Sequence, residues 1–134
     1  MNLRTIISTS NSKIPPIARL IAGAPLLLIG IQHLIGAAPM EPILVGAGIP
    51  LPELNATIAP IFEILAGILL LSGAFARVGG LIAVGAMAMA TYSHVVFDWD
   101  TEPPIAMPIV ILLAAVFVIW KGAGAWSVDR KRTV

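Results

Sequence analysis

The sequence has no cysteine and few charges: only 11% of its 134 residues are Asp, Glu, Lys or Arg. Without cysteine the chain cannot form disulfides, thiolate metal sites or thiol redox centres. Soluble domains carry about 25% charged residues, so this chain has too few charges to cover a surface that faces water. Its net charge of +1 gives no basis for binding nucleic acid. We therefore expect an integral membrane protein whose main partner is the lipid bilayer.

Apolar residues make up 58% of the chain and gather into four long stretches. These cover about residues 17–38, 55–75, 78–97 and 104–120. A membrane core about 30 Å thick is crossed by about 20 helical residues, and these stretches lack the alternation of a membrane strand. The sequence therefore predicts an all-α fold, a transmembrane four-helix bundle over residues 17–121. Residues 1–16 and the basic segment 122–134 are predicted to be tails.

Proline and asparagine mark where these helices should begin. Pro15–Pro16 and Pro103–Pro104 suit a first helical turn, because proline fixes φ and the N–H that it lacks has no partner there. Asn55 is expected to cap the second helix. The first stretch is too long for the apolar region of a signal peptide, so we interpret it as a membrane helix.

The basic residues all lie on one side of the predicted bundle. With four spans, the two chain ends share a side with the turn between the second and third helices. That side carries all 8 basic residues: Arg4, Lys13, Arg19, Arg77, Lys121, Arg130, Lys131 and Arg132. The other two loops carry Glu41, Glu53, Asp98, Asp100 and Glu102. Because basic loops stay in the cytoplasm, we predict a multi-pass protein of the cell (cytoplasmic) membrane with cytoplasmic N and C termini.

Near the cytoplasmic face, Arg19, Arg77, Trp120, Lys121 and Trp126 are expected to anchor the protein at the lipid headgroups.

Two other features of the sequence have more than one interpretation. The apolar loop at 39–54, broken by proline and glycine, either covers the bundle as a lid or rests among the headgroups. The small pairs Gly79/Ala83 and Ala86/Ala90 favour packing within one bundle, and a homo-oligomer face is the alternative.

Three ionisable residues inside the predicted spans stand out: His33, Glu63 and His94. An ionisable side chain is costly in lipid, so each is a candidate functional residue. The helix directions place all three in the outer half of the membrane, with Glu63 about 12 Å below the start of its helix. Gln32 and Tyr92 are their polar neighbours. We expect these five residues to form a pocket that opens toward the outer face.

This set suits a ligand with polar atoms. A His–carboxyl pair can bind a quinone carbonyl and pass a proton. Two histidines and a carboxylate can also hold a divalent metal, but the spacing gives that interpretation no support, so no metal is predicted. In the remaining alternative, Glu63 bonds a neighbouring helix and the histidines reach the headgroups.

The central sequence resembles the DoxX family of small bacterial and archaeal membrane proteins. The resemblance rests on a Gly-x-Pro, a Glu-x-x-x-Gly-x-x-Leu-x-x-Gly segment and a basic turn, here Gly48, Pro50, Glu63, Gly67, Leu70, Gly73 and Arg77. The first helix is similar at Arg19, Gly30 and His33, and the tail GAGAWSVDR at Gly122, Gly124, Trp126, Ser127, Val128 and Asp129. The likeness covers most of residues 17–130 and implies a four-helix membrane fold.

The resemblance also implies a link to respiratory or oxidative-stress redox complexes, such as thiosulfate:quinone oxidoreductase or superoxide- and thiol-handling partners. Our prediction is an accessory or subunit of a membrane redox system, rather than a stand-alone enzyme, that binds a quinone or other lipophile. The first alternative is a non-catalytic scaffold, assembly factor or lipid-binding protein. A small proton-coupled transporter is disfavoured, because that class commonly has its carboxylate in the first helix.

Overall fold

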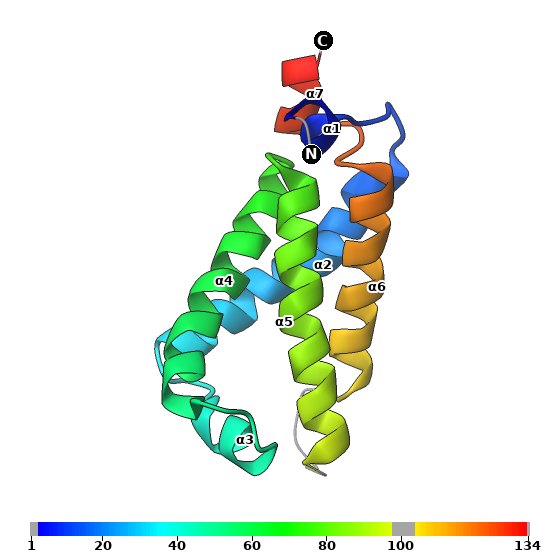
Figure 1. The fold of residues 1–134 in the computed structure, drawn as a ribbon. Helices are drawn as coiled ribbons and strands as arrows, with labels where there is room; N and C mark the ends of the chain where they lie inside the picture. Colours follow the sequence, from blue (N-terminus) through cyan, green and yellow to red (C-terminus); the bar gives the residue numbers. More distant parts are fainter. Residues whose placement is uncertain (1–2, 98–103, 134) are drawn as a thin grey trace.

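The computed structural model describes residues 3–97 and 104–133, and every regular element within them is a helix. The helices are α1 (Leu3–Ile7), α2 (Ile14–Leu34), α3 (Glu41–Gly46), α4 (Pro52–Ser72), α5 (Ala76–Val96), α6 (Ala106–Lys121) and α7 (Val128–Thr133). This confirms the all-α prediction. Figure 1 shows α1 and α7, and with them both chain ends, at one end of the molecule and α3 at the other.

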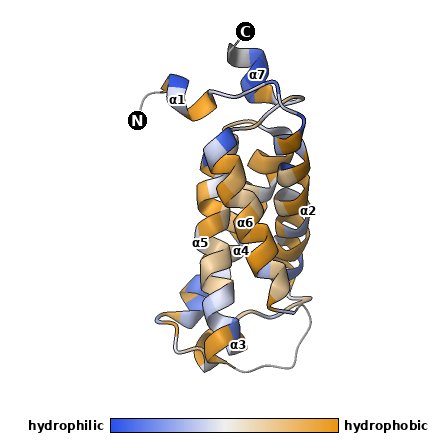
Figure 2. Ribbon diagram, turned by 90° about the vertical axis from the view of Figure 1, so that its right-hand side faces the viewer, coloured by the Kyte–Doolittle hydropathy of each residue, from blue (hydrophilic) through white to orange (hydrophobic). Residues whose placement is uncertain are grey.

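The four longer helices pack side by side. α2 contacts α4 and α6, and α5 also contacts α4 and α6. Hydrophobic residues dominate all four, and hydrophilic residues gather toward the two ends (Figure 2). In the described residues α2, α4 and α5, at 21 residues each, are long and apolar enough to cross a membrane, whereas α6 has 16 residues. The helical lengths and composition therefore support a membrane protein.

Helix starts differ from the prediction by a few residues. α4 begins at Pro52, and Asn55 is not its N-cap. The Asn55 side chain instead donates back to the Pro50 carbonyl oxygen at 2.8 Å. Pro52 explains the earlier start, because its ring fixes φ near the helical value and its missing N–H needs no partner in the first turn. For the same reason α2 begins at Ile14, ahead of Pro15.

Glycines set how closely the helices approach. A Cβ added to Gly67 of α4 would lie 2.8 Å from the Leu27 backbone nitrogen of α2, and one added to Gly30 would lie 2.9 Å from the Glu63 Cβ. A Cβ added to Gly79 of α5 would likewise lie 2.8 Å from the Leu69 Cβ of α4. These glycines pack against neighbouring helices of the same chain, and Gly79 belongs to one of the two small-residue pairs. A homo-oligomer face at those pairs stays a prediction.

The segment between α2 and α4 folds onto the bundle. It contains α3, and its Leu44, Ala47 and Ile49 form a small buried cluster. Gly46 packs against the ring of Phe97 at the end of α5. The segment therefore bridges α4 and the end of α5 rather than extending away from them.

Arg19 is placed differently from its predicted role at the headgroups. It is only 5% exposed, and its guanidinium donates to the carbonyl oxygens of Leu70 at 2.8 Å, Leu71 at 3.1 Å and Ala123 at 2.8 Å. The last carbonyls of a helix have no partner within it and attract a cation. Arg19 thus joins the end of α4 to the C-terminal segment, and its headgroup role is corrected.

Asp129 completes this junction from the opposite side. Its carboxylate, in a residue 1% exposed, accepts hydrogen bonds from the backbone N–H groups of Phe75 at 2.7 Å and Ala76 at 3.0 Å. These groups open α5, so Asp129 caps that helix although it lies 53 residues further along the chain. The Ala125 N–H donates to the Ser12 carbonyl oxygen at 2.8 Å. The two terminal segments therefore fold against each other and against the bundle.

Replacing Gly67 with alanine should loosen the contact between α2 and α4. The new methyl group would meet the α2 backbone, which cannot move aside as a side chain can, and overpacking of this kind costs about 1–3 kcal/mol. Thermal unfolding in mild detergent should show a lower midpoint. Gly85→Ala is the matched control on α5, because its Cβ meets nothing within 4 Å; equal midpoints for the two variants would contradict the packing argument.

Asp129→Ala should release the C-terminal segment and uncap α5. Loss of a capping side chain costs about 0.5–2 kcal/mol, so we expect a lower unfolding midpoint and faster protease cleavage within residues 122–134. Lys131→Ala is the control, because Lys131 is exposed. Identical cleavage rates in the two variants would show that Asp129 does not hold the segment.

Candidate functional site

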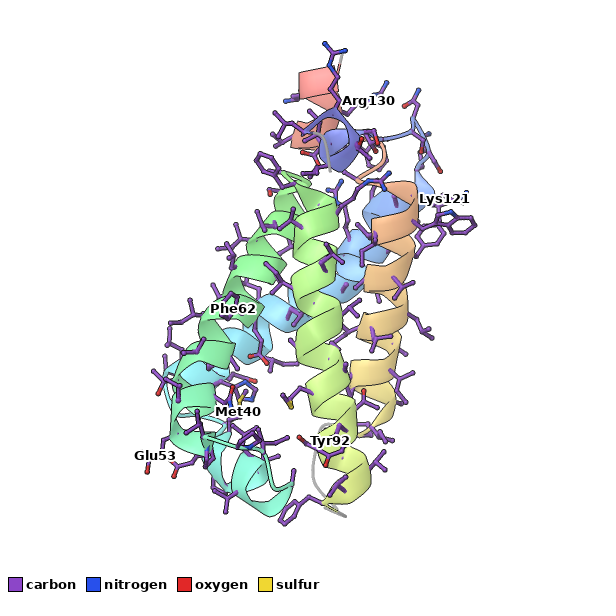
Figure 3. All side chains as sticks on the ribbon, viewed as in Figure 1. Met40, Glu53, Phe62, Tyr92, Lys121 and Arg130 are labelled. Atoms are coloured by element: carbon purple, nitrogen blue, oxygen red, sulfur yellow. The ribbon has the colours of Figure 1, made fainter. Side chains whose placement is uncertain are left out.

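A cavity of about 510 Å³ lies between α4 and α5, toward the α3 end of the molecule. α4 contributes Ile58, Phe62 and Glu63 to its wall, and α5 contributes residues from Leu81 to His94. Met40 and Leu44 line it from the segment that carries α3. Figure 3 shows the side chains gathered in this region, Met40 among them. The α3 segment thus forms part of the cavity wall.

The cavity reaches the outer surface of the bundle. Several of its lining residues are also exposed: Phe62 by 48%, Leu81 by 52% and Met89 by 42%. Phe62 belongs to α4, whereas Leu81 and Met89 belong to α5. Part of the cavity wall therefore continues onto the exposed apolar surface of α4 and α5.

A His33–Glu63 pair belongs to the polar part of the cavity wall. The Nδ1 atom of His33 lies 2.8 Å from the Oε2 atom of Glu63. Glu63 is 4% exposed. The tight contact at Gly30 brings α2 against Glu63, and His33 lies three residues beyond Gly30, on the same face of α2. The structure thus brings together two of the three ionisable residues that the sequence singled out.

Glu63 lies deeper along its helix than expected. It follows Pro52 by 11 residues, which at 1.5 Å per residue is about 16 Å. The expected depth was about 12 Å and assumed that the helix began at Asn55. Glu63 therefore sits near the middle of α4, at the deep side of the cavity.

His94 lines the same cavity from α5. Its Nδ1 lies 2.8 Å from the carbonyl oxygen of Ala90, one helical turn earlier. Within residues 3–97 and 104–133, no three His, Cys, Asp or Glu side chains come close enough together to hold a metal ion. His94 therefore shares the cavity with the His33–Glu63 pair without completing a metal-binding cluster.

The two polar neighbours have different positions. Gln32 lines the cavity, but Tyr92 does not; Tyr92 is 51% exposed. Ser93 lines the cavity in its place, because successive helical residues point about 100° apart. The expectation that Tyr92 forms part of the pocket is therefore wrong.

Sequence reasoning missed the methionines of the cavity. Met40, Met87, Met89 and Met107 all line it, and the chain has only 5 methionines. Methionine is flexible and polarizable and adapts to irregular ligands. Within an apolar stretch a methionine gives no sign of which way it faces, so only the packing reveals this set.

The remaining predicted residues lie away from the cavity. Trp120 is 69% exposed and Trp126 is 73% exposed. The Nζ atom of Lys121 lies 4.0 Å above the Trp120 ring, and Arg77 donates to the Ile119 carbonyl oxygen at 2.8 Å. Their role as headgroup anchors stays a prediction. The acidic loop with Asp98, Asp100 and Glu102 lies outside the described residues.

Comparison with known sequences gives the family. A search of the curated proteins and of the solved structures found no significant match. The sequence model of the DoxX family matches residues 14–99, a range that holds α2 to α5 and the His33–Glu63 pair. Because this family model matches most of the chain, the chain belongs to the DoxX family.

Proposed function

We propose that the protein binds a quinone-like lipophile in the cavity between α4 and α5, as an accessory or subunit of a membrane redox system. The observation that carries this proposal is the contact of partly buried His33 with buried Glu63, with 2.8 Å between Nδ1 and Oε2, in the wall of an otherwise largely apolar cavity. Small-molecule sites are mostly apolar cavities of about 300–1,000 Å³ with a few convergent polar groups. At about 510 Å³ this cavity falls within that range.

The proposed topology has α2, α4, α5 and α6 crossing the membrane. α6, with 16 residues, is about 24 Å long. A helix shorter than the membrane core is accommodated by local thinning of the bilayer and by packing against longer neighbours, and α6 packs against α2 and α5. Trp120 and Lys121 at its end suit the headgroup layer.

The exposed apolar part of the cavity wall supports a ligand that arrives from the membrane. Phe62, Leu81 and Met89 line the cavity and are also exposed, so in the proposed role a lipophile dissolved in the bilayer enters past them without passing through water. The pair could then bind a polar head, and the four methionines would adapt to the apolar body of the ligand.

The redox context follows from the family and from the ligand rather than from redox groups on the chain. The chain has no cysteine, so it cannot carry thiol chemistry itself. In the proposed role the ligand carries the electrons, partner proteins carry out the remaining chemistry, and His33 and Glu63 bind and exchange protons with the ligand head.

Glu63→Ala should abolish retention of the lipophile. Native mass spectrometry of protein released from mild detergent, with lipid extraction of the same sample, should find a quinone or similar lipophile with the wild type and at least tenfold less with the variant. The reason is that Glu63 orients His33, and loss of one buried polar partner costs about 1–3 kcal/mol.

Glu53→Ala is the matched control for that experiment. Glu53 opens the same helix but is exposed and points away from the bundle (Figure 3), so its variant should retain the lipophile. Wild-type protein that carries only ordinary phospholipid, in amounts equal to those of both variants, would contradict the proposal and favour a scaffold that acts through protein partners.

The proposed orientation can be tested with single cysteines, because the natural chain has none. Ser10→Cys and Lys131→Cys should react with a membrane-impermeant maleimide only after the cells are opened. Glu41→Cys and Glu53→Cys, at the α3 end, should react in intact cells. Labelling of both sets on the same side of the membrane would exclude the proposed topology, and the reverse pattern would invert it.

A further inference from the structure

Among the glycines inside α2, α4 and α5, all of which the structure describes, Gly85 is the one that helix packing does not explain. A Cβ added to Gly85 would meet nothing within 4 Å. Nor does its backbone require glycine, because the positive-φ glycines of the described residues lie outside these helices. At each of the other glycines an added Cβ would lie 2.8–3.0 Å from an atom of a neighbouring helix: Gly23, Gly30, Gly67, Gly79 and Gly80.

Gly85 instead lies in the wall of the cavity. It is exposed and lines the cavity from α5. Leu81 and Met89, one helical turn to either side, line the cavity as well and share the same face of α5. Glycine weakens a helix relative to alanine, so its use here costs stability without serving the packing. What the missing side chain provides is room in the cavity wall, between two large side chains.

This room lies at the level of the His33–Glu63 pair. α4 and α5 run in opposite directions (Figure 1), and they meet where a Cβ on Gly79 would lie 2.8 Å from the Leu69 Cβ. Glu63 precedes Leu69 by six residues, and Gly85 follows Gly79 by six. Both therefore lie about 9 Å from that contact, in the same direction along the bundle. A ligand head at the pair is thus level with Gly85.

We infer that Gly85 determines the size of the ligand head: a planar ring lies against the bare backbone of α5 at Gly85 while one polar atom of the head contacts the His33–Glu63 pair. This rests on the proposed function, because it concerns the head of the same lipophile. A helix surface without a Cβ lets the face of a ring approach the backbone closely. A side chain at this position would occupy the space of the ring, and such overpacking is unfavourable.

The test compares two probes that differ in ring size, one-ring duroquinone and two-ring dimethylnaphthoquinone, which is methylated at both free positions of its quinone ring. Equilibrium dialysis, with the protein in lipid nanodiscs and empty nanodiscs as the blank, gives both dissociation constants. The wild type should bind both probes. Gly85→Ala should weaken binding of the two-ring probe about tenfold and that of duroquinone less. Gly85→Leu should weaken binding of both.

Two controls separate ligand size from protein stability. Ala88→Leu adds the same side chain at an exposed position of α5 that is not part of the cavity lining, so both affinities should equal those of the wild type. Gly85→Ala protein that native mass spectrometry shows to be free of lipophile should unfold at a midpoint no lower than that of equally lipophile-free wild type. The reason is that alanine favours a helix and its Cβ meets no neighbour.

Failure of this inference is distinguishable from failure of the proposed function. Unchanged affinities in Gly85→Leu, equal losses for the two probes in Gly85→Ala, weaker binding in Ala88→Leu or a lower midpoint of lipophile-free Gly85→Ala would each overturn the size inference, while wild-type binding stayed intact. Binding of neither probe to the wild type above the nanodisc blank would overturn the proposed function as well. If Gly85→Leu does not fold, the two-probe comparison in Gly85→Ala still decides.

Discussion

The close contact between α2 and α4 positions the polar groups inside the apolar part of this protein. Helices in lipid gain little from burying apolar surface against each other, so they associate through close packing of small residues. Gly30 and Gly67 provide such packing, because a Cβ at either position would collide with the opposite helix. His33 and Glu63 consequently meet at 2.8 Å. Glu63 is buried by the same contact that supplies its partner.

A second junction holds the helices at the opposite end, and it is polar rather than apolar. Arg19 binds the last carbonyls of α4 and the C-terminal segment, while Asp129 caps α5. Gly73, with φ of 67°, ends α4 in a left-handed conformation and accepts a hydrogen bond from the Asp129 N–H at 3.0 Å. The residues of the tail that resemble the DoxX pattern therefore have a structural role at this junction. With one end closed in this way, the cavity lies toward the other end, beneath the α3 segment.

The sequence was informative wherever a strong physical rule applied to single residues. The cost of a charge in lipid identified His33 and Glu63, and proline marked the first turns of α2 and α4. It was less informative for residues with several partners within reach. Arg19 is a residue type typical of headgroup anchors but lies against the last carbonyls of α4, and Asn55 is a residue type typical of N-caps but bonds back to Pro50. Tyr92 fell outside the cavity because the rotation of α5 about its axis follows from packing, which one sequence does not reveal.

Composition and hydropathy by themselves determined that this is a helical membrane protein. The chain has too few charged residues to cover a surface that faces water, and its apolar stretches are long enough for membrane helices. They also identified the ionisable residues that need a partner. Only the tertiary structure decided which residues meet: that His33 pairs with Glu63 while His94 bonds to Ala90, that four methionines line one cavity, and that Asp129 caps a helix from far along the chain. The reason is that lipid sets the length and polarity of a helix, whereas steric contact between neighbouring helices sets its rotation and partners.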